Sequence, residues 1–309
     1  MKKEELKNCI MIYNPVSTGF NLKSISNIAK VIKEYNLTPY ALASTYSGNL
    51  IELVKQVDDE KNIILTIGGD GTVSEAYKAL ADGNQKGVYA HIPTGTTNDM
   101  AKNYDVISKT PETITEDILN GEITTLDTFK VNDQIAAYTA VQGYLAHVPF
   151  ITPHNLKKSL GYASYVISAG KDLLKKPIKY DISYNIDNEY GRDNFILTSV
   201  SNSKGFAGVN LFNEAKLDDG KIEILMIKEA TPKIILKVFN DFIHNKIDLN
   251  KYSEYILYKQ AKEIELKFND IFPNYAIDID GEDSKIKPTE NNDTIKFSVG
   301  EKIKVLKRK

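Results

Sequence analysis

The sequence predicts an α/β region followed by an antiparallel β region. Up to about residue 125, short apolar runs alternate with segments whose apolar residues recur every three or four positions, which is the pattern of alternating strands and helices around a parallel sheet. Farther along, apolar and polar residues alternate with a period of two, as in antiparallel strands. The length of 309 residues favours two domains, because a single core rarely grows to that size.

The first region is expected to consist of strand–helix pairs. The apolar run at 62–67 predicts a strand buried on both faces, and Gly68 and Gly69 follow it directly. Because the carboxyl ends of parallel strands meet at one edge of a sheet, a ligand crevice is expected there. The expected strands cover 9–13, 39–44, 62–67 and 88–92, and the expected helices cover 23–36, 49–58, 73–81 and a segment from 98.

The second region is expected to form an antiparallel sheet or sandwich. Alternating residues at 222–227, 263–268 and 295–300 predict three of its strands. The boundary between the regions is expected between Gly121 and Asp127. Residues 156–174 predict an amphipathic helix with lysines at both ends, which either covers a sheet face or forms a wall that admits a lipid or touches a membrane.

The composition excludes several classes of protein. A net charge of −2 argues against general nucleic-acid binding, which needs a basic field. A single cysteine, Cys9, cannot form an internal disulfide, which fits a reducing cytosol. With only two arginines, Arg192 and Arg308, any phosphate is expected to be held by backbone N–H groups, lysines and metal ions. No apolar stretch reaches the roughly 18 residues of a membrane helix, so any membrane contact is expected to be peripheral.

The glycine-rich turn Gly68–Thr72 predicts a phosphate site. Its three glycines remove β-carbons where the chain turns, and the following helix supplies free N–H groups and a positive dipole end. Asp70 would repel a phosphate, so Mg²⁺ or an ordered water is expected between them. The alternative is a tight turn capped by Asp70.

Two further turns follow strands of the same expected sheet. Pro93–Asp99 offers hydroxyl donors, with Thr97 and Asn98 as helix N-caps, and Asp99 adds a second carboxylate. The other turn is Asn14–Gly19. The sequence contains no P-loop, dinucleotide-binding or nucleophile-elbow motif.

Two acidic turns lie in the second region. Asp280 and Glu282 flank a glycine after a short alternating strand. They either deliver a general base to a hydroxyl, with the second carboxylate near a metal, or form a solvated hairpin turn. Lys216–Lys221 is either a hairpin turn or a small metal site with oxygen ligands.

Taken together, the motifs resemble those of the diacylglycerol/sphingosine lipid-kinase superfamily, and most closely the soluble bacterial diacylglycerol kinases of Gram-positive type. Leu156–Val166 resembles the segment that borders the family's lipid cleft. The segments similar to family motifs are Gly68–Thr72 (GGDGT), Pro93–Asp99, Thr198–Gly208, Ala215–Gly220 and Ile279–Glu282.

The resemblance implies a Rossmann-like nucleotide-binding α/β domain over residues 1–126 and an antiparallel β-sandwich lipid-substrate domain over 127–299, with 300–309 returning to the first. It implies an ATP-dependent kinase that converts diacylglycerol to phosphatidic acid, with catalytic and structural Mg²⁺. The expected partners are ATP and a lipid taken from a membrane surface, and no nucleic acid. The expected location is the cytoplasm, peripheral at the inner face of the membrane. A homodimer is compatible with the sequence, which does not fix the oligomeric state.

The resemblance also implies a role for each motif residue. Asp280 would be the general base, with Glu282 as its neighbour. Asp70 and Asp99 would organise the catalytic Mg²⁺, and Asp127 would join this carboxylate network. Asp219 would bind the structural Mg²⁺ through its side chain, together with the backbone carbonyls of Lys216 and Lys221. ATP would contact Asn14, Gly68, Gly69, Gly71, Thr72, Gly95, Thr96, Thr97 and Asn98.

Some residues depart from the family pattern, and other functions stay open. The first turn, NPVSTGF, is one residue longer than the usual NPxSGK, and Phe20 stands where a lysine is common. The effect of Thr18 and Phe20 on ATP or membrane binding stays open. The alternatives are another acceptor, such as a sphingoid base or phosphatidylglycerol, an NAD kinase, which shares GGDGT, and a non-catalytic nucleotide or lipid sensor.

Overall fold

The chain divides into two compact units. Unit 1 comprises residues 1–128 and 300–309, and unit 2 comprises residues 129–299. The helix expected at 156–174 lies outside the described residues. A computed structural model describes residues 3–15, 21–82, 84–95, 98–104, 110–143, 178–206, 209–210, 212, 215–244, 246–270, 277–284, 286 and 293–308.

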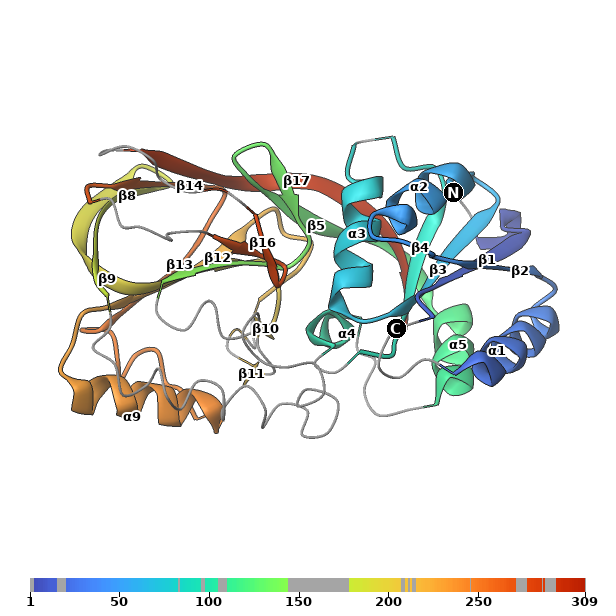
Figure 1. Ribbon diagram of the computed structural model, residues 1–309, viewed down its shortest axis with the longest axis horizontal. Helices are drawn as coiled ribbons and strands as arrows, with labels where there is room; N and C mark the ends of the chain where they lie inside the picture. The colour runs from blue at the N-terminus through green and yellow to red at the C-terminus, as the bar shows by residue number, and fades with distance from the viewer. Residues whose placement is uncertain are drawn as a thin grey trace. The chain divides into compact units, whose positions relative to one another are not determined.

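Unit 1 is built on a parallel β-sheet (Figure 1). Its strands are β1 (Asn8–Tyr13), β2 (Thr38–Ala43), β3 (Asn62–Gly68), β4 (Val88–Pro93) and the end of β17 (Thr294–Lys307). They lie in the order β2–β1–β3–β4–β17. All seven residues of β3 are buried, as expected for a central strand covered on both faces. The chain returns to this sheet at its end, where Val305 lies opposite Tyr89.

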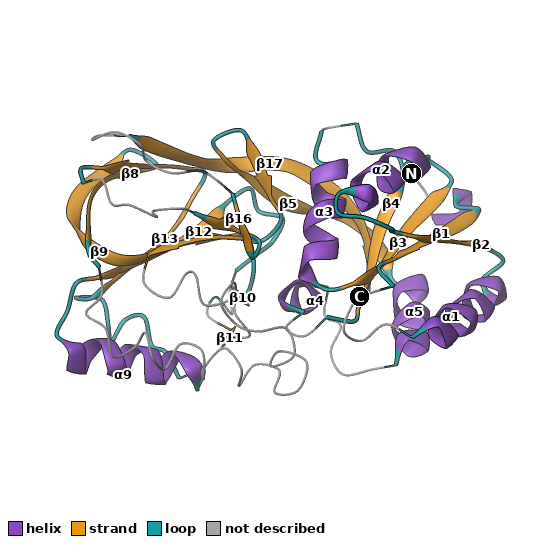
Figure 2. Ribbon diagram, viewed as in Figure 1, coloured by secondary structure: helices purple, strands orange, loops and turns teal. Residues whose placement is uncertain are grey.

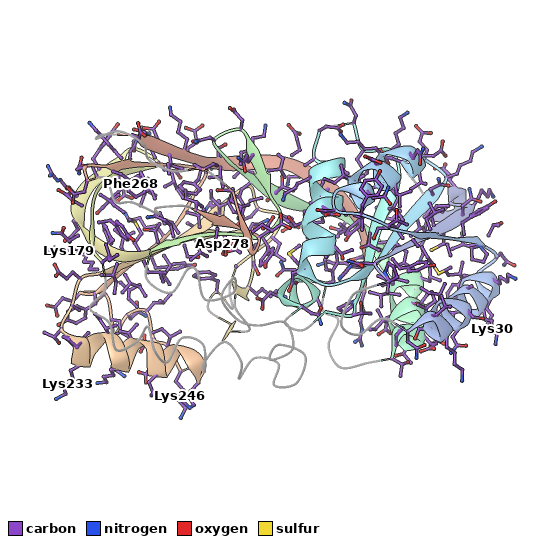
Figure 3. All side chains as sticks on the ribbon, in the orientation of Figure 1. Lys30, Lys179, Lys233, Lys246, Phe268 and Asp278 are labelled. Carbon is purple, nitrogen blue, oxygen red and sulfur yellow. The ribbon has the colours of Figure 1, made fainter. Side chains whose placement is uncertain are left out.

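Two pairs of helices cover this sheet. The pairs are α1 (Leu22–Glu34) with α5 (Pro111–Asn120), and α2 (Asn49–Val57) with α3 (Asp70–Leu80). Figure 1 shows the two pairs on opposite faces of the sheet. In α1 the apolar residues at helical spacing are buried, whereas Lys30 is exposed and points outward in Figure 3. The remaining helical turns are η1 (Lys3–Glu5) and α4 (Asp99–Asn103).

Unit 2 is an antiparallel sandwich of two layers (Figure 2). Its strands are β6 (Gln134–Ala136), β7 (Thr139–Gly143), β8 (Tyr180–Ile186), β9 (Glu189–Ser201), β12 (Ile222–Lys228), β13 (Ile256–Ala261), β14 (Glu263–Phe268), β15 (Asp278–Ile279) and β16 (Glu282–Asp283), with the ends of β5 (Glu122–Val131) and β17. The long strand β9 belongs to both layers, because its first half pairs with β8 and its second half with β7 and β12. A separate small ribbon joins β10 (Gly205–Phe206) to β11 (Val209–Asn210).

The two layers enclose an apolar core. Phe195, Met226 and Phe268 are members of this core, and Figure 3 shows Phe268 inside the unit. Helix α9 (Pro232–Ile243) contributes Ile235 and Val238 to a second cluster. The predicted fold class is therefore confirmed as a Rossmann-like α/β unit followed by an antiparallel β-sandwich. None of the helices within the described segments is long and apolar enough to cross a membrane.

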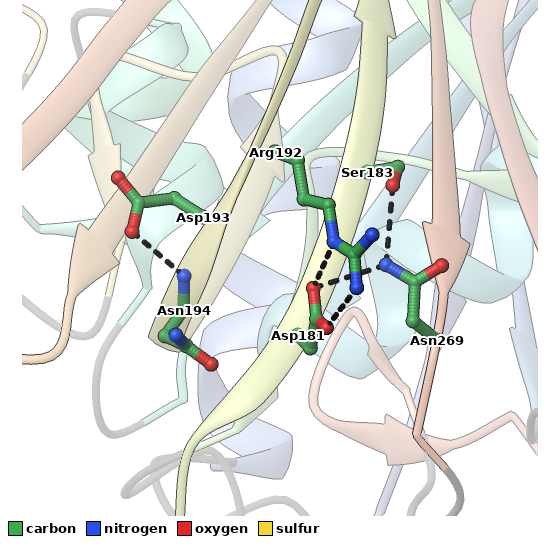
Figure 4. Close-up of polar contacts among 6 residues, drawn as sticks. All are labelled: Asp181, Ser183, Arg192, Asp193, Asn194 and Asn269. Carbon is green, nitrogen blue, oxygen red and sulfur yellow. Dashed lines mark hydrogen bonds and ion pairs between the residues drawn. The ribbon is translucent and has the colours of Figure 1, made fainter.

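An arginine fork ties β8 to β9 (Figure 4). The Arg192 guanidinium donates Nε–H to Asp181 Oδ1 (2.8 Å) and Nη2–H to Asp181 Oδ2 (2.5 Å). Asn269 donates from Nδ2 to Asp181 Oδ1 and to Ser183 Oγ. The hydrogen bonds from Arg192 lower the pKa of the Asp181 carboxyl. One of the two arginines is thus engaged by a carboxylate on the neighbouring strand.

Candidate active site

The first glycine-rich turn is shorter than predicted, because α3 begins at Asp70 and not at Val73. The carbonyl of Gly69 accepts the N–H groups of Thr72 (3.0 Å) and Val73 (3.3 Å), which starts the helix three residues earlier. A β-carbon on Gly68 would lie 2.1 Å from Thr72 Oγ1. The turn itself is therefore confined to Gly68 and Gly69, and Asp70, Gly71 and Thr72 form the first turn of the helix.

The second turn packs directly against the first. The N–H of Thr94 donates to the carbonyl of Gly68 (2.7 Å). A β-carbon on Gly95 would lie 2.6 Å from the Cα of Gly69, so this close approach requires glycine. Thr96 and Thr97 lie outside the described residues.

Asn98 closes this second turn. Its backbone has a φ of 52°, a left-handed conformation that asparagine tolerates better than most residues. Its Oδ1 accepts the N–H of Gly95 and its Nδ2 donates to the carbonyl of Gly95, each at 2.8 Å. The described contacts of this side chain thus shape the turn itself, whereas the first turn of α4 receives its cap from another residue.

That cap is Asp70. Its Oδ1 accepts the N–H of Met100 in α4 at 2.9 Å. Asp99, the first residue of α4, is buried. Desolvation, and then the nearby Asp99 carboxylate, raise the pKa of Asp70 to about 6, against the opposite effect of the backbone N–H groups of residues 98–100. The structure therefore brings two of the three predicted carboxylates of unit 1, Asp70 and Asp99, together at the edge where β3 and β4 end.

Two other predicted residues of unit 1 are Asn14, just after β1, and Asp127, on β5. Asn14 directly follows β1, and its N–H donates to the carbonyl of Ile67 (3.4 Å), so it stands beside the end of β3. Thr18 and Phe20 lie outside the described residues. Asp127 is buried on β5, and Lys302 Nζ on β17 lies 3.3 Å from its Oδ1.

In unit 2, Asp280 and Gly281 form the two-residue turn between β15 and β16. Both have positive φ, 57° and 86°, as in a tight hairpin turn. Glu282 in this hairpin is exposed. The Asp280 side chain, in contrast, is buried and accepts three backbone N–H groups, from Ala137 (2.8 Å), Tyr138 (3.0 Å) and Thr139 (3.2 Å). Such donors compensate the charge of a buried carboxylate and fix its orientation.

The turn that contains Lys216, Asp219 and Lys221 leads to a buried carboxylate that sequence reasoning missed. Asp219 is exposed, and its Oδ1 accepts the N–H of Lys221 (3.0 Å). Glu223, on β12, is 1% exposed, and its Oε2 has no hydrogen-bond partner. Burial raises the pKa of Glu223 to about 7, and Asp219 adds to this effect. The signal was a single acid inside the otherwise apolar run of β12.

Both predicted metal sites fit Mg²⁺ chemically. In unit 1, the negative charge of one carboxylate makes ionisation of the adjacent carboxylate less favourable. A bound cation would offset this repulsion. In unit 2, the unpartnered oxygen of Glu223 lies in the field of Asp219. Over the segments that the structure describes, no three His, Cys, Asp or Glu side chains gather as a metal site. Mg²⁺ commonly needs only one or two carboxylates, with water and phosphate oxygens as its other ligands.

This chain combines two units. The first is a parallel-sheet unit with glycine turns and paired carboxylates, and the second is a β-sandwich. Residues 8–131 match the family model of the diacylglycerol kinase catalytic domain. The chain is 25% identical to a diacylglycerol kinase of Bacillus subtilis (strain 168), over 92% of this chain and 93% of the relative. It is 25% identical to a diacylglycerol kinase of Staphylococcus saprophyticus, over 89% of each.

Solved structures agree on the fold. A crystal structure of a diacylglycerol kinase from Bacillus anthracis strain Sterne matches with a TM-score of 0.75 and 18% identity, over 98% of this chain and 97% of that one. The resemblance predicted from the motifs is confirmed, since residues 8–131 match the model of the diacylglycerol kinase catalytic domain and the relatives named diacylglycerol kinase align with most of the chain.

Proposed function

We propose that this protein is an ATP-dependent lipid kinase that phosphorylates the hydroxyl of diacylglycerol to give phosphatidic acid. The observation that carries the proposal is the pair of interlocked glycine turns with Asp70 and Asp99, within residues that match the diacylglycerol kinase catalytic domain. Full-length relatives named diacylglycerol kinase support the choice of acceptor.

ATP would lie against the two turns. The backbone N–H groups at the start of α3 suit a polyphosphate, because the first N–H groups of a helix lack partners within it. Gly69 and Gly95 lack β-carbons and approach each other closely, which brings the backbones of the two turns together. The proposed contacts are Asn14, Gly68, Gly69, Gly71, Thr72, Gly95, Thr96, Thr97 and Asn98.

Mg²⁺ would be held in unit 1 by Asp70 and Asp99, with Asp127 as a further carboxylate. When bound, it neutralises the charge that develops on the transferring phosphoryl group. The position of this Mg²⁺ would be set by the orientation of the two carboxylates. Met100 N–H orients Asp70, and burial at the start of α4 orients Asp99.

Asp280 would accept the proton of the lipid hydroxyl as this hydroxyl attacks the γ-phosphate, with Glu282 as its neighbour. The three N–H groups of residues 137–139 hold this carboxylate in one orientation. Precise orientation is what a general base requires.

A second Mg²⁺ would stabilise unit 2, through the Asp219 side chain and the carbonyls of Lys216 and Lys221. The unpartnered, buried Glu223 oxygen beside this turn supports a cation there. The enzyme would act in the cytoplasm at the inner face of the membrane, from which it takes its lipid.

A panel of acceptors tests the proposal. Purified protein is incubated with Mg²⁺ and ATP and with diacylglycerol, a sphingoid base, phosphatidylglycerol or NAD, and the phosphorylated product is identified by mass. Phosphatidic acid as the main product supports the proposal. A main product from another acceptor reassigns the substrate, and ATP binding without any product shows a sensor and not an enzyme.

A further inference from the structure

Helix α3 holds the short helix α4 at two points. At the start of α3, Asp70 accepts the N–H of Met100 in the first turn of α4. Two turns farther along α3, the hydroxyl of Tyr77 is hydrogen-bonded to the hydroxyl of Tyr104, which directly follows α4. One contact therefore lies at each end of α4.

The second contact is a buried hydroxyl pair inside unit 1. Tyr77 is fully buried and Tyr104 is 2% exposed. The ring of Tyr89, on β4, packs edge-on against both rings, with centroids 5.6 Å from Tyr77 and 6.4 Å from Tyr104. The Tyr89 hydroxyl lies 2.7 Å from Thr66 Oγ1 on β3. The pair thus rests on two central strands and is hydrogen-bonded away from water.

A five-residue helix cannot hold itself in place, because helices this short are unstable without tertiary contacts. The position of α4 therefore depends on its contacts with α3 and with the strands of unit 1. Asp99 opens α4, and Met100 provides the N–H that orients Asp70. A shift of α4 would move Asp99 and would withdraw the N–H group that orients Asp70, and these are the two carboxylates proposed to organise Mg²⁺.

We propose that the hydroxyl pair of Tyr77 and Tyr104 is a positioning element, which fixes α4 and thereby sets the geometry of Asp70 and Asp99 for Mg²⁺ and ATP. The proposal rests on the proposed function for the role of these carboxylates. The two tyrosines would act indirectly, through the position of α4, and would not contact the nucleotide.

The test uses Tyr77→Phe, Tyr104→Phe and the double variant in the full chain. The double variant leaves no unpaired hydroxyl and keeps the proposal testable if a single variant folds poorly. Thr115→Val is the matched control, because it removes another buried hydroxyl of unit 1, one that donates to the carbonyl of Pro111 within α5.

Two measurements are made on each variant: amide hydrogen exchange at Met100, and the half-saturating Mg²⁺ concentration for ATP binding. In the tyrosine variants we expect Met100 exchange to accelerate by about tenfold and the half-saturating Mg²⁺ concentration to rise by about threefold. The double variant is expected to match the singles, since the two hydroxyls act as one unit. Thr115→Val is expected to change neither quantity.

Either quantity left unchanged in the tyrosine variants overturns the proposal, even where their urea midpoints fall. Unchanged exchange shows that the pair does not hold α4, and unchanged Mg²⁺ dependence shows that α4 does not set the site. If the unaltered protein binds no ATP at any Mg²⁺ concentration, the proposed function fails by itself. The exchange rates then still decide whether the pair holds α4.

Discussion

At Asp280 the chain adopts a left-handed backbone, which allows the side chain to fold back onto the N–H groups of residues 137–139. This arrangement requires two acceptor oxygens. An asparagine side chain at this position would offer only one, and its amide would face a backbone N–H, so that two donors would oppose each other. The same carboxylate is the proposed base, so its loss affects both folding and turnover.

Asp280→Asn is expected to lower kcat by about 10²- to 10⁴-fold, the usual contribution of a general base, while the affinity for ATP changes little. Steady-state kinetics and ATP binding measure these quantities. Asp278→Asn is the matched control: it alters a buried carboxyl of the same hairpin, whose Oδ1 can still accept the N–H of Gly281. A nearly normal kcat for Asp280→Asn would contradict the assignment of the base.

His91 gives unit 1 a defined response to acid. The ring is 2% exposed, its Nδ1 lies 2.9 Å from Thr66 Oγ1, and burial lowers its pKa to about 3. In the unfolded chain this histidine gains a proton near its ordinary pKa, whereas in the folded chain it stays neutral. Its contribution to stability is therefore present above pH 6.5 and is lost as the pH falls from there toward 3.

His91→Gln is expected to flatten this dependence. Relative to the variant, the unaltered protein should lose about 2 kcal/mol of its free energy of unfolding between pH 7 and pH 5, measured by urea unfolding. His244→Gln, which alters an exposed histidine, should follow the unaltered protein. Parallel curves for the protein and His91→Gln would show that His91 does not control acid unfolding.

At the scale of elements, the periodic segments could be predicted and the hydrogen bonds between distant segments could not. The apolar runs of β3 and α1 are local patterns, so their positions followed from the sequence. The start of α3 was misplaced, because Asp70-Gly71 resembles a turn and the carbonyl of Gly69 that begins the helix has no signature of its own.

In the candidate site, too, local motifs could be predicted from the sequence and contacts between distant segments could not. The glycine turns and their acids were found as motifs, because each is contiguous in the sequence. The burial of Glu223 and the donors to Asp280 were not, since they depend on strands that lie far away along the chain. Glu223 lies opposite Ser201 and Gln260 only once β12 has paired with its neighbours.

The acidic turn before β12 is the proposed site of the structural Mg²⁺. Mg²⁺ should raise the free energy of unfolding, by about 2.7 kcal/mol at a hundred times its dissociation constant, because it binds the folded turn. Asp219→Asn and Glu223→Gln should each reduce this increment. Asp248→Asn should retain it, since Asp248 is an exposed acid whose Oδ1 accepts the N–H groups of Asn250 and Lys251.

Chemical unfolding with and without Mg²⁺ measures the increment, with Ca²⁺ as a second cation. An equal Mg²⁺ increment in all three variants would place the stabilising ion elsewhere. A rise in apo stability for Glu223→Gln is expected in addition, because a neutral amide costs less to bury than a carboxylate.

Over the whole molecule, the scarcity of arginine has a structural counterpart. Arg192 is engaged by Asp181, and Arg308 lies 4.0 Å from Asp117, so both arginines pair with carboxylates outside the glycine turns. The proposed phosphate site instead consists of backbone, hydroxyl and carboxylate groups. That metal ions, lysines and N–H groups take the place of guanidinium forks at a phosphate site stays a prediction from the composition.

The chain leaves unit 1, forms unit 2 and then returns to unit 1 at its end. Unit 1 is discontinuous in sequence, since residues 300–307, the end of β17, form its final strand beside β4. Ile303, Val305 and Leu306 in this strand are fully buried. Burying three such side chains stabilises a fold by about 5–9 kcal/mol, which is comparable with the total stability of a domain.

Deletion of residues 300–309 is therefore expected to unfold unit 1 and to abolish ATP binding, although every glycine-turn residue is still present. Deletion of 308–309 alone removes neither the buried residues nor the strand, and should leave ATP binding and the urea midpoint nearly unchanged. Soluble yield, ATP binding and urea unfolding compare the two deletions. A soluble chain that lacks 300–309 and binds ATP normally would show that the first 128 residues suffice for unit 1, and that the returning strand is dispensable.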